Sequence, residues 1–379
     1  MKRTLAGTPP ESQAASAFSD PGFSADVIAW QKRHGRHALP WQNTRNAYRV
    51  WLSEIMLQQT QVATVIPYYQ RFLDRFPTVE ALAAAPQEEV MALWSGLGYY
   101  SRARNLHRCA QQVVSQYGGR FPGDPALLAE LPGIGRSTAA AIAAFSYGTR
   151  AAILDGNVKR VFARVFGIEG VVTSKPVEDQ MWLRAVALLP EEGIEAYTQG
   201  LMDLGATICT RSKPACERCP LAARCVARAT GRTNALPARA PKKAVPEKHA
   251  VMLVITHGGD LLLEQRPGSG IWGGLLSLPQ AGGMEPQALA PELLQQEVLA
   301  AAAAFGEPAS LQRLQTFTHQ FTHFKLHVQP FQVELKQRIA MASEGIHVWL
   351  PLAGIEPAPL PAPVKRLLLG LFGQADLFS

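Results

Sequence analysis

Apolar residues recur at spacings of three and four through the first 230 residues, which is the spacing of amphipathic α-helices. Further along, residues 250–256, 261–263 and 327–333 form short apolar runs typical of β-strands, whereas residues 286–304 have a helical pattern. The chain is therefore predicted to combine an all-α part with an α/β part. In the first part the runs end at helix-stop signals such as Phe76-Pro77-Thr78, Gly96-Leu97-Gly98 and Leu131-Pro132-Gly133.

Residues 231–247 divide the two parts. They are rich in alanine, proline and basic residues and have no hydrophobic periodicity, so we expect a basic linker that runs extended over the surface. A chain of 379 residues, 47% of them apolar, is too long for one ordinary core and predicts about two domains. We expect a helical domain at residues 23–230 and a second domain at residues 248–379.

Residues 1–22 mix prolines and basic residues without the apolar core of a signal peptide, and we expect them to form a disordered tail. The sequence contains no run of about eighteen apolar residues that could cross a membrane. These features predict a soluble protein with no membrane association, located in the cytoplasm and on the nucleoid if the source is bacterial.

The net charge of +7 is distributed unevenly. Residues 1–230 contain 25 basic and 19 acidic residues, residues 231–245 contain four basic residues and no acid, and residues 246–379 contain 8 basic and 11 acidic residues. Positive charge in the first part and the linker is typical of a surface that binds a polyanion such as DNA. Ordinary surface solvation also explains an excess of this size, so the choice depends on the motifs.

Four of the five cysteines, Cys209, Cys216, Cys219 and Cys225, form the pattern C-x6-C-x2-C-x5-C. Four thiolates can hold a structural zinc ion or an iron–sulfur cluster, and disulfides are not expected in an unexported chain. Zinc sites usually have two short C-x2-C pairs, whereas only one is present here. The spacing therefore favours an iron–sulfur cluster, with zinc as the alternative. Cys109 lies in a helical pattern and is expected to be a packed side chain.

Two acidic residues are candidates for acid chemistry. Glu54 is the only charged residue between Arg49 and Arg71, and its apolar neighbours should raise its pKa and suit it to general acid catalysis. The alternative is a glutamate that faces solvent on an amphipathic helix. Asp155 follows an apolar run and precedes a predicted helix, so the local sequence indicates a helix N-cap at least as strongly as a catalytic group.

Residues 131–138, with the sequence LPGIGRST, join two helical patterns within a predicted helix-hairpin-helix at about residues 124–148. Gly133 and Gly135 can adopt backbone conformations closed to other residues, so N–H groups at the start of the next helix can approach a phosphate closely. Such a contact reads no base sequence. An ordinary packing corner between two helices is the alternative.

The hairpin, the aspartate near the next helix start and the cysteine loop at residues 209–225 occur in the same order in the helix-hairpin-helix DNA glycosylases related to endonuclease III, which the chain resembles. Over residues 23–379 it is similar to the MutY-type adenine DNA glycosylases. This resemblance implies an all-α helix-hairpin-helix glycosylase domain with an iron–sulfur loop, followed by an α/β Nudix (MutT)-like domain. The segments that carry it are Trp51-Leu52-Ser53-Glu54, Leu57-Gln58-Gln59-Thr60-Gln61-Val62, Gly96-Leu97-Gly98-Tyr99-Tyr100 and Leu154-Asp155-Gly156-Asn157-Val158-Lys159-Arg160.

The resemblance implies roles that the residues alone leave open. Glu54 would protonate the leaving adenine, and Asp155 would stabilise the positive charge that develops on the sugar, as paired carboxylates do in glycoside hydrolysis. Asn157 would orient groups around Asp155. The four cysteines would hold a [4Fe–4S] cluster that serves DNA engagement rather than bond cleavage.

The resemblance also implies which residues contact DNA. Gln59 and Tyr99 resemble the residues that enter the base stack where the adenine has been extruded. Lyase-type relatives have a nucleophilic lysine where this chain has Ser137, which cannot form a Schiff base, so a monofunctional enzyme that uses water is implied. Lys159 could react adventitiously with the abasic product. The residues expected at the DNA are Gln59, Tyr99, Gly133, Gly135, Ser137 and Lys159.

Residues 261–279 resemble part of a MutT-type (Nudix) domain. Nudix hydrolases hold magnesium with an R-E-x-x-E-E helix, but no arginine or lysine occurs between Arg266 and Arg313. Hydrolysis of nucleoside diphosphates is therefore not expected, and a binding role remains.

The MutY family reads 8-oxoguanine opposite the adenine with a loop that usually contains Phe-Ser-His. The corresponding residues here are Phe321, Thr322 and His323, where threonine keeps the hydroxyl and adds a methyl group. Without the resemblance, His319, His323 and His327 would indicate only a β-strand with surface imidazoles.

The sequence thus predicts a monomeric, monofunctional adenine DNA glycosylase of base excision repair. Its substrate would be double-stranded DNA that contains A·8-oxoguanine or A·G mispairs. One alternative is a bifunctional glycosylase/lyase of the endonuclease III type, which Ser137 and the second domain disfavour. The other is a DNA-binding protein without catalysis, which the presence of both Glu54 and Asp155 disfavours.

Overall fold

The computed structural model describes residues 18–241, 244–268, 270–281, 290–321, 323–339 and 346–373. The chain forms two compact units, one made of Met1–Ala83 and Arg108–Pro241 and the other of Ala84–His107 and Lys242–Ser379. Within the described ranges, no helix combines the length and the apolar character needed to span a membrane.

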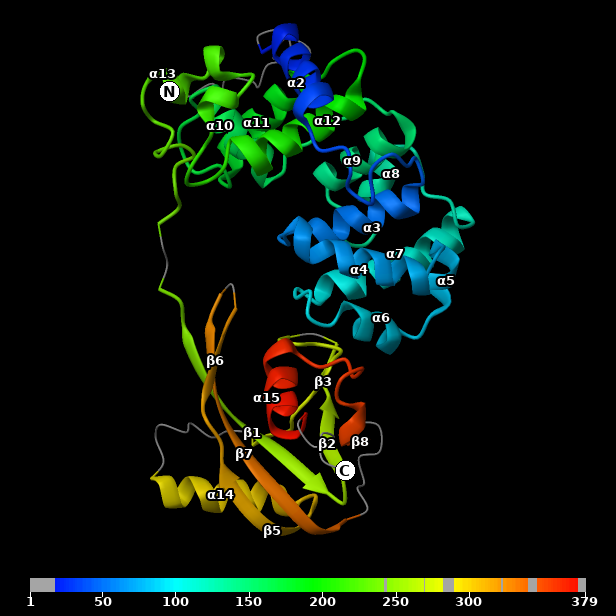
Figure 1. Cartoon of the computed structure of the whole chain (residues 1–379), viewed down its shortest axis with the longest axis vertical. Helices are drawn as coiled ribbons and strands as arrows, with labels where there is room; N and C mark the ends of the chain where they lie inside the picture. The colour runs from blue at the N-terminus through cyan, green and yellow to red at the C-terminus, as the bar shows by residue number, and fades with distance from the viewer. Residues whose placement is uncertain are drawn as a thin grey trace, which may run out of the picture. The chain divides into compact units, whose positions relative to one another are not determined.

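The first unit is helical, as the spacing of apolar residues predicts (Figure 1). Helix α7 (Ser101–Tyr117) begins in the second unit and ends in the first. The other helices of the first unit are α2 (Pro21–His34), α3 (Ala47–Leu57), α4 (Val62–Arg75), α5 (Val79–Ala84), α8 (Pro125–Ala129), α9 (Arg136–Tyr147), α10 (Gly156–Val165), α11 (Lys175–Ala187), α12 (Ile194–Asp203) and α13 (Val226–Ala229). A π-helical turn, Leu204–Ile208, and two 3-10 turns, Cys216–Arg218 and Ala222–Arg224, lie around the cysteines.

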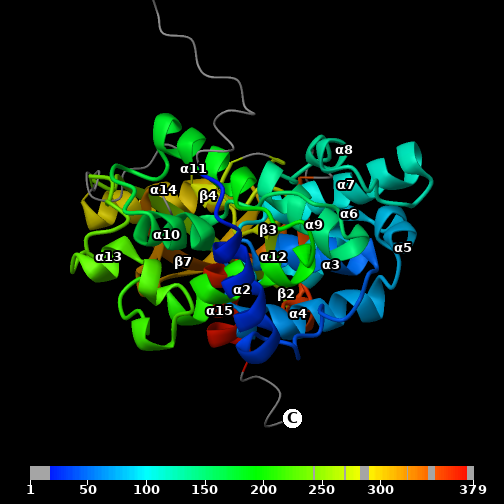
Figure 2. The same cartoon turned by 90° about the horizontal axis from the view of Figure 1, so that it is seen from above.

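Helix α2 lies along α12, and both helices contribute to one apolar core with α9 and α10 (Figures 1 and 2). At its centre Phe23 meets Phe162 and Tyr197 edge to face, with ring centroids 5.9 and 6.4 Å apart. Each buried aromatic side chain stabilises the fold by about 1.5–3 kcal/mol relative to an exposed one. This core fixes the position of α10, whose first turn contributes to the candidate site described below.

The predicted helix-hairpin-helix consists of α8, a tight turn and α9. Gly133 has a φ of +81°, a conformation that disfavours every residue with a Cβ atom, so its glycine is required as predicted. Gly135 differs from the prediction, because its φ of −89° is open to ordinary residues and a Cβ there would meet no atom within 4 Å. It is the N-cap of α9, where a glycine leaves the first N–H groups of the helix uncovered.

The expected N-terminal tail lies mainly outside the described residues, but its last two residues already belong to α2. The Asp20 carboxylate caps this helix by accepting a hydrogen bond from the Phe23 N–H at 3.1 Å, and Pro21 fits the first helical position. Arg224, next to a cysteine of the loop, forms ion pairs with Asp20 and Asp26. The start of the helical unit is therefore fixed to the cysteine loop.

The start of the predicted linker is packed rather than extended over the surface. Leu236 is only 4% exposed, and its carbonyl accepts a hydrogen bond from Arg164 at 2.9 Å. Ala238 forms a parallel β-bridge with Val171. Burial of Leu236 and these backbone bonds stabilise a packed conformation, although the polar composition of the segment suggested an extended chain. The expected free linker is thus shortened at its N-terminal end.

The second unit contains a mixed β-sheet, which confirms the predicted α/β class of the C-terminal part. The core order of its described strands is β3-β2-β1-β7-β5, with β4 paired to β1, β6 to β7 and β8 to β2. Strands β1 and β7 are parallel, and the other pairs are antiparallel. The strands are β1 (Glu247–His257), β2 (Asp260–Gln265), β3 (Leu276–Ser277), β4 (Gln280–Ala281), β5 (Gly306–Arg313), β6 (Phe317–Gln320), β7 (Lys325–Arg338) and β8 (His347–Pro351).

Strand β1 is buried on both faces, since five consecutive residues from Val251 to Ile255 are at most 1% exposed. Val251 and Leu253 share a core with Val298 of helix α14 (Pro291–Ala303), which packs on one face of the sheet (Figure 1). A strand covered on both faces gives a continuous apolar run rather than an alternating one. That pattern explains why β1 could be recognised from the sequence.

Residues Ala84–His107 are grouped with the C-terminal residues, although the sequence analysis placed them in the helical domain. They contain α6 (Gln87–Trp94) and the first part of α7. The Ser95 hydroxyl donates a hydrogen bond to the Leu360 carbonyl at 2.9 Å, near the start of helix α15 (Ala362–Phe372), and Arg104 donates to the Gly273 carbonyl. These bonds join segments far apart in the sequence, so local patterns give no sign of them.

Candidate active site and DNA-contact residues

The first unit contains a large open cavity of about 1540 Å³. Its lining includes both candidate carboxylates, Glu54 and Asp155, as well as Gln59, Ser137 and Asn157. The cavity is larger than the roughly 300–1,000 Å³ of ordinary small-molecule pockets, so it has room for an extruded nucleotide. The structure therefore brings together most of the catalytic and DNA-contact residues that the sequence suggested for this unit, whereas Gly133 and Lys159 do not line the cavity.

Glu54 lies in the last part of α3, between the buried residues Ser53 and Ile55. The side chain is partly accessible to solvent through the cavity and is packed against protein atoms on its other sides. Burial raises the pKa of Glu54 to about 8, and the nearby Asp155 carboxylate acts in the same direction. At neutral pH Glu54 is therefore a protonated carboxylic acid that can donate a proton into the cavity.

Asp155 is the N-cap of α10, as the local sequence indicated. Its Oδ1 atom accepts hydrogen bonds from the backbone N–H groups of Asn157 at 3.0 Å and Val158 at 2.8 Å. Burial raises the pKa of Asp155 above its usual range, but the two N–H bonds and the positive charges of Arg160 and Lys159 favour the ionised form. Asp155 thus has charge-stabilising partners in addition to its place in the cavity.

Asn157 is held in place by the guanidinium of Arg160. Arg160 Nη2 donates to Asn157 Oδ1 at 2.8 Å and to the Gly205 carbonyl at 2.6 Å, while its Nε donates to the Cys209 carbonyl at 2.7 Å. A Cβ on Gly205 would lie 2.4 Å from Asn157 Cβ, so only glycine fits there. These contacts connect the residues around Asp155 directly to the first cysteine of the loop.

Ser137 and Lys159 are both engaged in contacts of the protein. The Ser137 hydroxyl accepts a hydrogen bond from the Leu154 N–H at 3.0 Å and so holds the chain immediately before Asp155. Lys159 forms an ion pair with Glu178 at 2.8 Å and is only 15% exposed. Ser137 lines the cavity, whereas Lys159 is not among the residues that line it.

The four cysteines of the predicted cluster line one small cavity together with Leu221. Their thiols are close enough for each charge to affect the others, because Cys209 and Cys225 act to raise the pKa of Cys216 and of Cys219. Four convergent sulfur donors around an apolar pocket fit an iron–sulfur cluster. Cys109 lies apart from them and is fully buried, as predicted for a packed side chain.

Arg164 holds the cysteine loop from within. It is 2% exposed, and its Nη1 lies 3.3 Å from Cys209 Sγ and donates to the Thr210 carbonyl at 2.7 Å. Its other nitrogens donate to the carbonyls of Arg211 and Leu236. A buried arginine stabilises the structure only when its donors are satisfied, and here three backbone carbonyls serve that purpose. Sequence analysis did not single out this residue.

The two residues expected to enter the base stack have strained backbones. Gln59 has a φ of +58° and Tyr99 a φ of +49°, and both are exposed. Within the second unit, Arg102 donates to the carbonyls of Leu97 and Gly98, and its guanidinium lies 5.3 Å from the centre of the Tyr99 ring. The turn that carries Tyr99 is therefore supported by a buried cation.

An aromatic cluster in the second unit contains the expected lesion-reading residues. The ring of Phe321 lies 4.6 Å from His319 and 4.6 Å from Phe324, and His323 packs against Phe324 at 4.9 Å. Trp272 joins the cluster 5.7 Å from Phe321 and was not anticipated as a site residue. Trp272 has a positive φ of 54°, an uncommon backbone conformation that marks it in the structure but cannot be recognised in the sequence.

Thr322 lies outside the described residues. His327 belongs to a different group from the aromatic cluster, because it stacks on His249 with ring centroids 4.9 Å apart and contacts Glu247 at 3.2 Å. The surface-imidazole alternative thus holds for His327. Burial lowers the pKa of His319, with a smaller effect from Arg366 in the same direction, and both favour the neutral imidazole.

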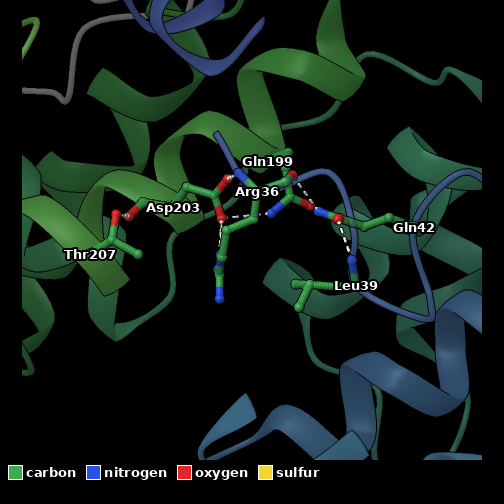
Figure 3. Close-up of polar contacts among 6 residues, drawn as sticks. All are labelled: Arg36, Leu39, Gln42, Gln199, Asp203 and Thr207. Carbon is green, nitrogen blue, oxygen red and sulfur yellow. Dashed lines mark hydrogen bonds and ion pairs between the residues drawn. The ribbon is translucent and has the colours of Figure 1, made fainter. Parts of the chain in front are cut away.

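The sequence analysis did not predict any residue of one wall of the cavity. The segment between α2 and α3 contributes Arg36, Trp41 and Asn43, and α12 contributes Gln199. Figure 3 shows that Arg36 and Gln199 meet at Asp203, the last residue of α12. These partners are separated by more than 160 positions, so no local spacing relates them.

Comparison with known protein families supports the assignment of a helical domain and a C-terminal α/β domain. A model of the HhH-GPD superfamily of base excision DNA repair proteins matches residues 52–185, and a NUDIX-domain model matches residues 250–370. A model of the iron–sulfur binding domain of endonuclease III matches residues 209–225, which contain the four cysteines. The chain therefore carries an iron–sulfur site, as the cysteine spacing favoured.

Individual relatives extend over nearly the whole chain. The adenine DNA glycosylase of Buchnera aphidicola subsp. Acyrthosiphon pisum (strain APS) is 35% identical over 347 residues, which cover 91% of this chain and 96% of that protein. The adenine DNA glycosylase of Homo sapiens is 34% identical and covers 93% of this chain and 74% of the relative. The solved structure of a thermostable thymine-DNA glycosylase is 28% identical with a TM-score of 0.50 and covers 58% of this chain and 98% of that one. With a helical glycosylase fold, an iron–sulfur loop and a NUDIX domain in one chain, this protein belongs to the adenine DNA glycosylase family.

Proposed function

We propose that this chain removes adenine from duplex DNA where adenine is mispaired with 8-oxoguanine or guanine, and that it acts as a monomer. Membership of the family makes the chain a DNA N-glycosylase that binds DNA and works in base excision repair. The observation that carries the proposal is the pair Glu54 and Asp155 in one cavity, where burial raises the pKa of both carboxyl groups and Asp155 in addition accepts two backbone N–H bonds that favour its ionised form.

Glu54 is the proposed general acid. A purine leaves easily only when it is protonated, because it then departs as a neutral base rather than as an anion. The raised pKa of Glu54 keeps a proton available at neutral pH, and positioned acid catalysis of this kind contributes about 10²- to 10⁴-fold to a rate. Asp155 is the proposed charge stabiliser, because its carboxylate can face the cationic sugar that forms as the bond breaks.

The second step is attack of water on the cationic sugar. An amine nucleophile would instead retain the sugar as a Schiff base and lead to strand cleavage. Ser137 has no amine, and its oxygen already accepts a bond from the Leu154 N–H. Lys159 is paired with Glu178 and lies outside the cavity lining. Both observations support a monofunctional enzyme that leaves an intact abasic strand.

The four cysteines would hold a [4Fe–4S] cluster, which supplies a rigid centre for its loop. The loop carries several basic side chains, and Arg164 and Arg160 connect it to the helix that begins at Asp155. We assign the loop to DNA engagement, because positive charge at a fixed position neutralises backbone phosphates. Gly133 and Gly135 of the hairpin are assigned the same kind of contact, through the uncovered N–H groups at the start of α9.

Base flipping requires that the gap left in the duplex be filled. We assign this role to Gln59 and Tyr99, whose exposed side chains project from strained turns. An aromatic ring that stacks on the remaining bases contributes about 1–3 kcal/mol, which offsets part of the cost of extruding a base.

Recognition of the opposite base is assigned to the aromatic cluster of the second unit. Adenine is a normal base, so selectivity must come from its partner. Phe321 and Trp272 offer ring faces, and His323 offers a hydrogen-bonding imidazole at the edge of the cluster. We therefore propose that this cluster contacts 8-oxoguanine, with Trp272 as an additional member.

The first prediction concerns the pH dependence of excision. Single-turnover release of adenine should decrease as pH rises through about 8, because burial raises the pKa of Glu54 to about 8 and only the protonated carboxyl can donate. As a control, Glu54→Gln should still bind the duplex but lose about 10²- to 10⁴-fold in excision rate, with no step in its pH profile near 8. Near-normal excision by this variant would remove Glu54 from the role of acid.

The second prediction concerns the product. After complete adenine release the DNA strand should remain intact and should break only on heating in alkali, because Ser137 offers no amine. Strand breakage and base release are measured in the same time course by gel electrophoresis with and without alkali. Enzymatic breakage in step with base release would favour the glycosylase/lyase alternative.

The third prediction concerns the metal. Protein purified without oxygen should be yellow-brown and contain about four iron atoms per chain, as four thiolate ligands support a [4Fe–4S] cluster. Elemental analysis measures iron and zinc together. Stoichiometric zinc without iron, in protein made with an ample iron supply, would contradict the assignment.

The fourth prediction concerns lesion selectivity. Replacement of Phe321 and His323 by alanine should reduce the preference for A·8-oxoguanine over A·G by roughly ten- to one-hundredfold, as expected from loss of a hydrogen bond and ring packing. The preference is the ratio of single-turnover rates on the two duplexes at one fixed salt concentration. His327→Ala is the matched control, because His327 lies outside the aromatic cluster, and its ratio should equal that of the wild type. An unchanged ratio in the double variant would place lesion reading elsewhere.

A further inference from the structure

Two basic side chains of the C-terminal part of the chain have no ion pair among the described residues. Residues 246–379 contain 8 basic and 11 acidic residues, so carboxylates are in excess there. Four of the bases pair with a carboxylate, namely Arg266 with Glu264, Lys325 with Glu247, Lys336 with Glu307 and Arg338 with Asp260. Arg313 donates to the Gln329 side-chain oxygen, and Lys365 has a contact of its own. Lys248 and Arg366 remain, and both are exposed.

Lys248 lies beside the aromatic cluster of the second unit. In the parallel register of β1 and β7 it is opposite Leu326, and its Nζ lies 4.8 Å from the centre of the Phe324 ring. Phe324 stacks on Phe321 with ring centroids 4.6 Å apart. Successive side chains of a strand point to opposite faces, so the neighbouring Glu247 carboxylate is directed away from this face. The Lys248 charge thus remains unpaired next to the rings.

Arg366 approaches the same cluster from α15. The segment before this helix is held to β3 by a hydrogen bond from the Leu276 N–H to the Pro359 carbonyl at 3.1 Å. Burial is the main cause of the lowered pKa of His319, and the charge of Arg366 adds to it, so the two side chains are near each other. The His319 ring lies 4.6 Å from that of Phe321. Both unpaired cations are therefore found at the aromatic cluster.

An exposed cation without a carboxylate partner is suited to bind an anion. A base that stacks on protein rings brings an anion with it, because a phosphate adjoins its sugar on either side. Contacts to these phosphates fix the position of a nucleotide without reading its base. The Phe324 ring also orients the Lys248 ammonium through a cation–π contact, so this side chain loses less freedom when a phosphate binds.

We propose that Lys248 and Arg366 bind the backbone phosphates next to the base opposite adenine and so hold that nucleotide against the aromatic cluster. The inference rests on the proposed contact between this cluster and the opposite base, and it concerns the strand that carries that base. The two cations supply affinity and placement, whereas the rings and His323 supply selectivity. A C-terminal part with an excess of acid thereby has a local site for a polyanion.

The test measures how DNA affinity depends on salt. Each phosphate that a cation neutralises contributes about 0.9 to the slope of the log association constant against the log salt concentration. Lys248→Met and Arg366→Met remove the charge but keep an apolar side chain. Each should reduce the slope by about 0.9, and the double variant by about 1.8. At low salt each should weaken binding by roughly two- to tenfold. The full-length protein and an A·8-oxoguanine duplex are used, with Glu54→Gln in all samples to keep the adenine in place.

Two control variants separate phosphate binding from support of the rings. Lys336→Met removes the same charge from the same unit, but Lys336 is paired with Glu307 near the other end of β7, so its slope should equal that of the unaltered protein. Lys248→Arg keeps the charge and should keep the slope. Phosphate contacts read no base, so Lys248→Met should weaken binding to A·8-oxoguanine and A·G duplexes by the same factor.

Uncharged linkages locate the contacted phosphates. A duplex with methylphosphonate linkages on both sides of 8-oxoguanine should bind the protein with intact Lys248 and Arg366 more weakly, by about the factor that the double variant shows. The double variant should bind this duplex and the natural duplex equally, because the lost contacts are the same. The same linkages around the adenine should weaken both proteins by one common factor.

The outcomes differ clearly from one another. An unchanged salt slope in the two methionine variants would overturn the proposal. A decreased preference for A·8-oxoguanine over A·G with an unchanged slope would do so too, because the cations would then act only through the rings. Equal sensitivity of the intact protein and the double variant to the linkages around 8-oxoguanine would also contradict it. If the intact protein binds A·8-oxoguanine no better than A·T, the proposed function is wrong, whereas the salt slopes still test the two cations.

Discussion

The rest of the site depends on the first turn of α10, where the unpaired N–H groups of a helix terminus hold the Asp155 carboxylate. Two hydrogen bonds fix this side chain, and a helix terminus stabilises negative charge by about 0.3–1 kcal/mol or more when partly buried. Successive turns of the same helix carry Arg160 and Arg164, which bind the cysteine loop. One rigid helix thus connects the proposed charge stabiliser with the iron–sulfur site. A shift of the loop would be transmitted to Asn157 through Arg160.

The proposed mechanism needs one protonated and one ionised carboxyl group, and the fold surrounds the two side chains differently, although burial raises the pKa of both. Asp155 receives two backbone N–H bonds and the field of two basic residues, whereas Glu54 lies on a helix among buried apolar side chains. The Asp155 charge also acts to raise the pKa of Glu54, whereas the N–H bonds and positive charges at Asp155 favour its ionised form. These differences favour the division of labour that we propose, with Glu54 as the acid and Asp155 as the carboxylate, as in cleavage of other glycosidic bonds.

Features encoded by neighbouring residues could be predicted from the sequence, and features made by distant residues could not. Asp155 as an N-cap, the hairpin turn at Gly133 and the cysteine loop all follow from spacings within about twenty residues. The Arg36–Asp203 pair joins residues 167 positions apart, and its partners have no unusual sequence context. Trp272 likewise reaches Phe321 only because the β-sheet brings their loops together. Gly135 shows the reverse error, since a glycine in a recognisable motif suggested a special conformation that it does not adopt.

Among the described residues, the non-glycine positions with a positive φ are Asn43, Gln59, Tyr99 and Trp272. The last three belong to the proposed recognition surfaces, and Asn43 lines the cavity. A backbone of this kind costs about 1–3 kcal/mol per residue and persists only where the surroundings determine it. Such support is visible at Tyr99, where buried Arg102 binds the turn. A side chain already fixed before DNA arrives loses little freedom on binding. Extrusion of a base costs a few kcal/mol. Backbone strain that is already present in the free protein does not have to be created on binding, so more of the binding energy can be used to extrude the base.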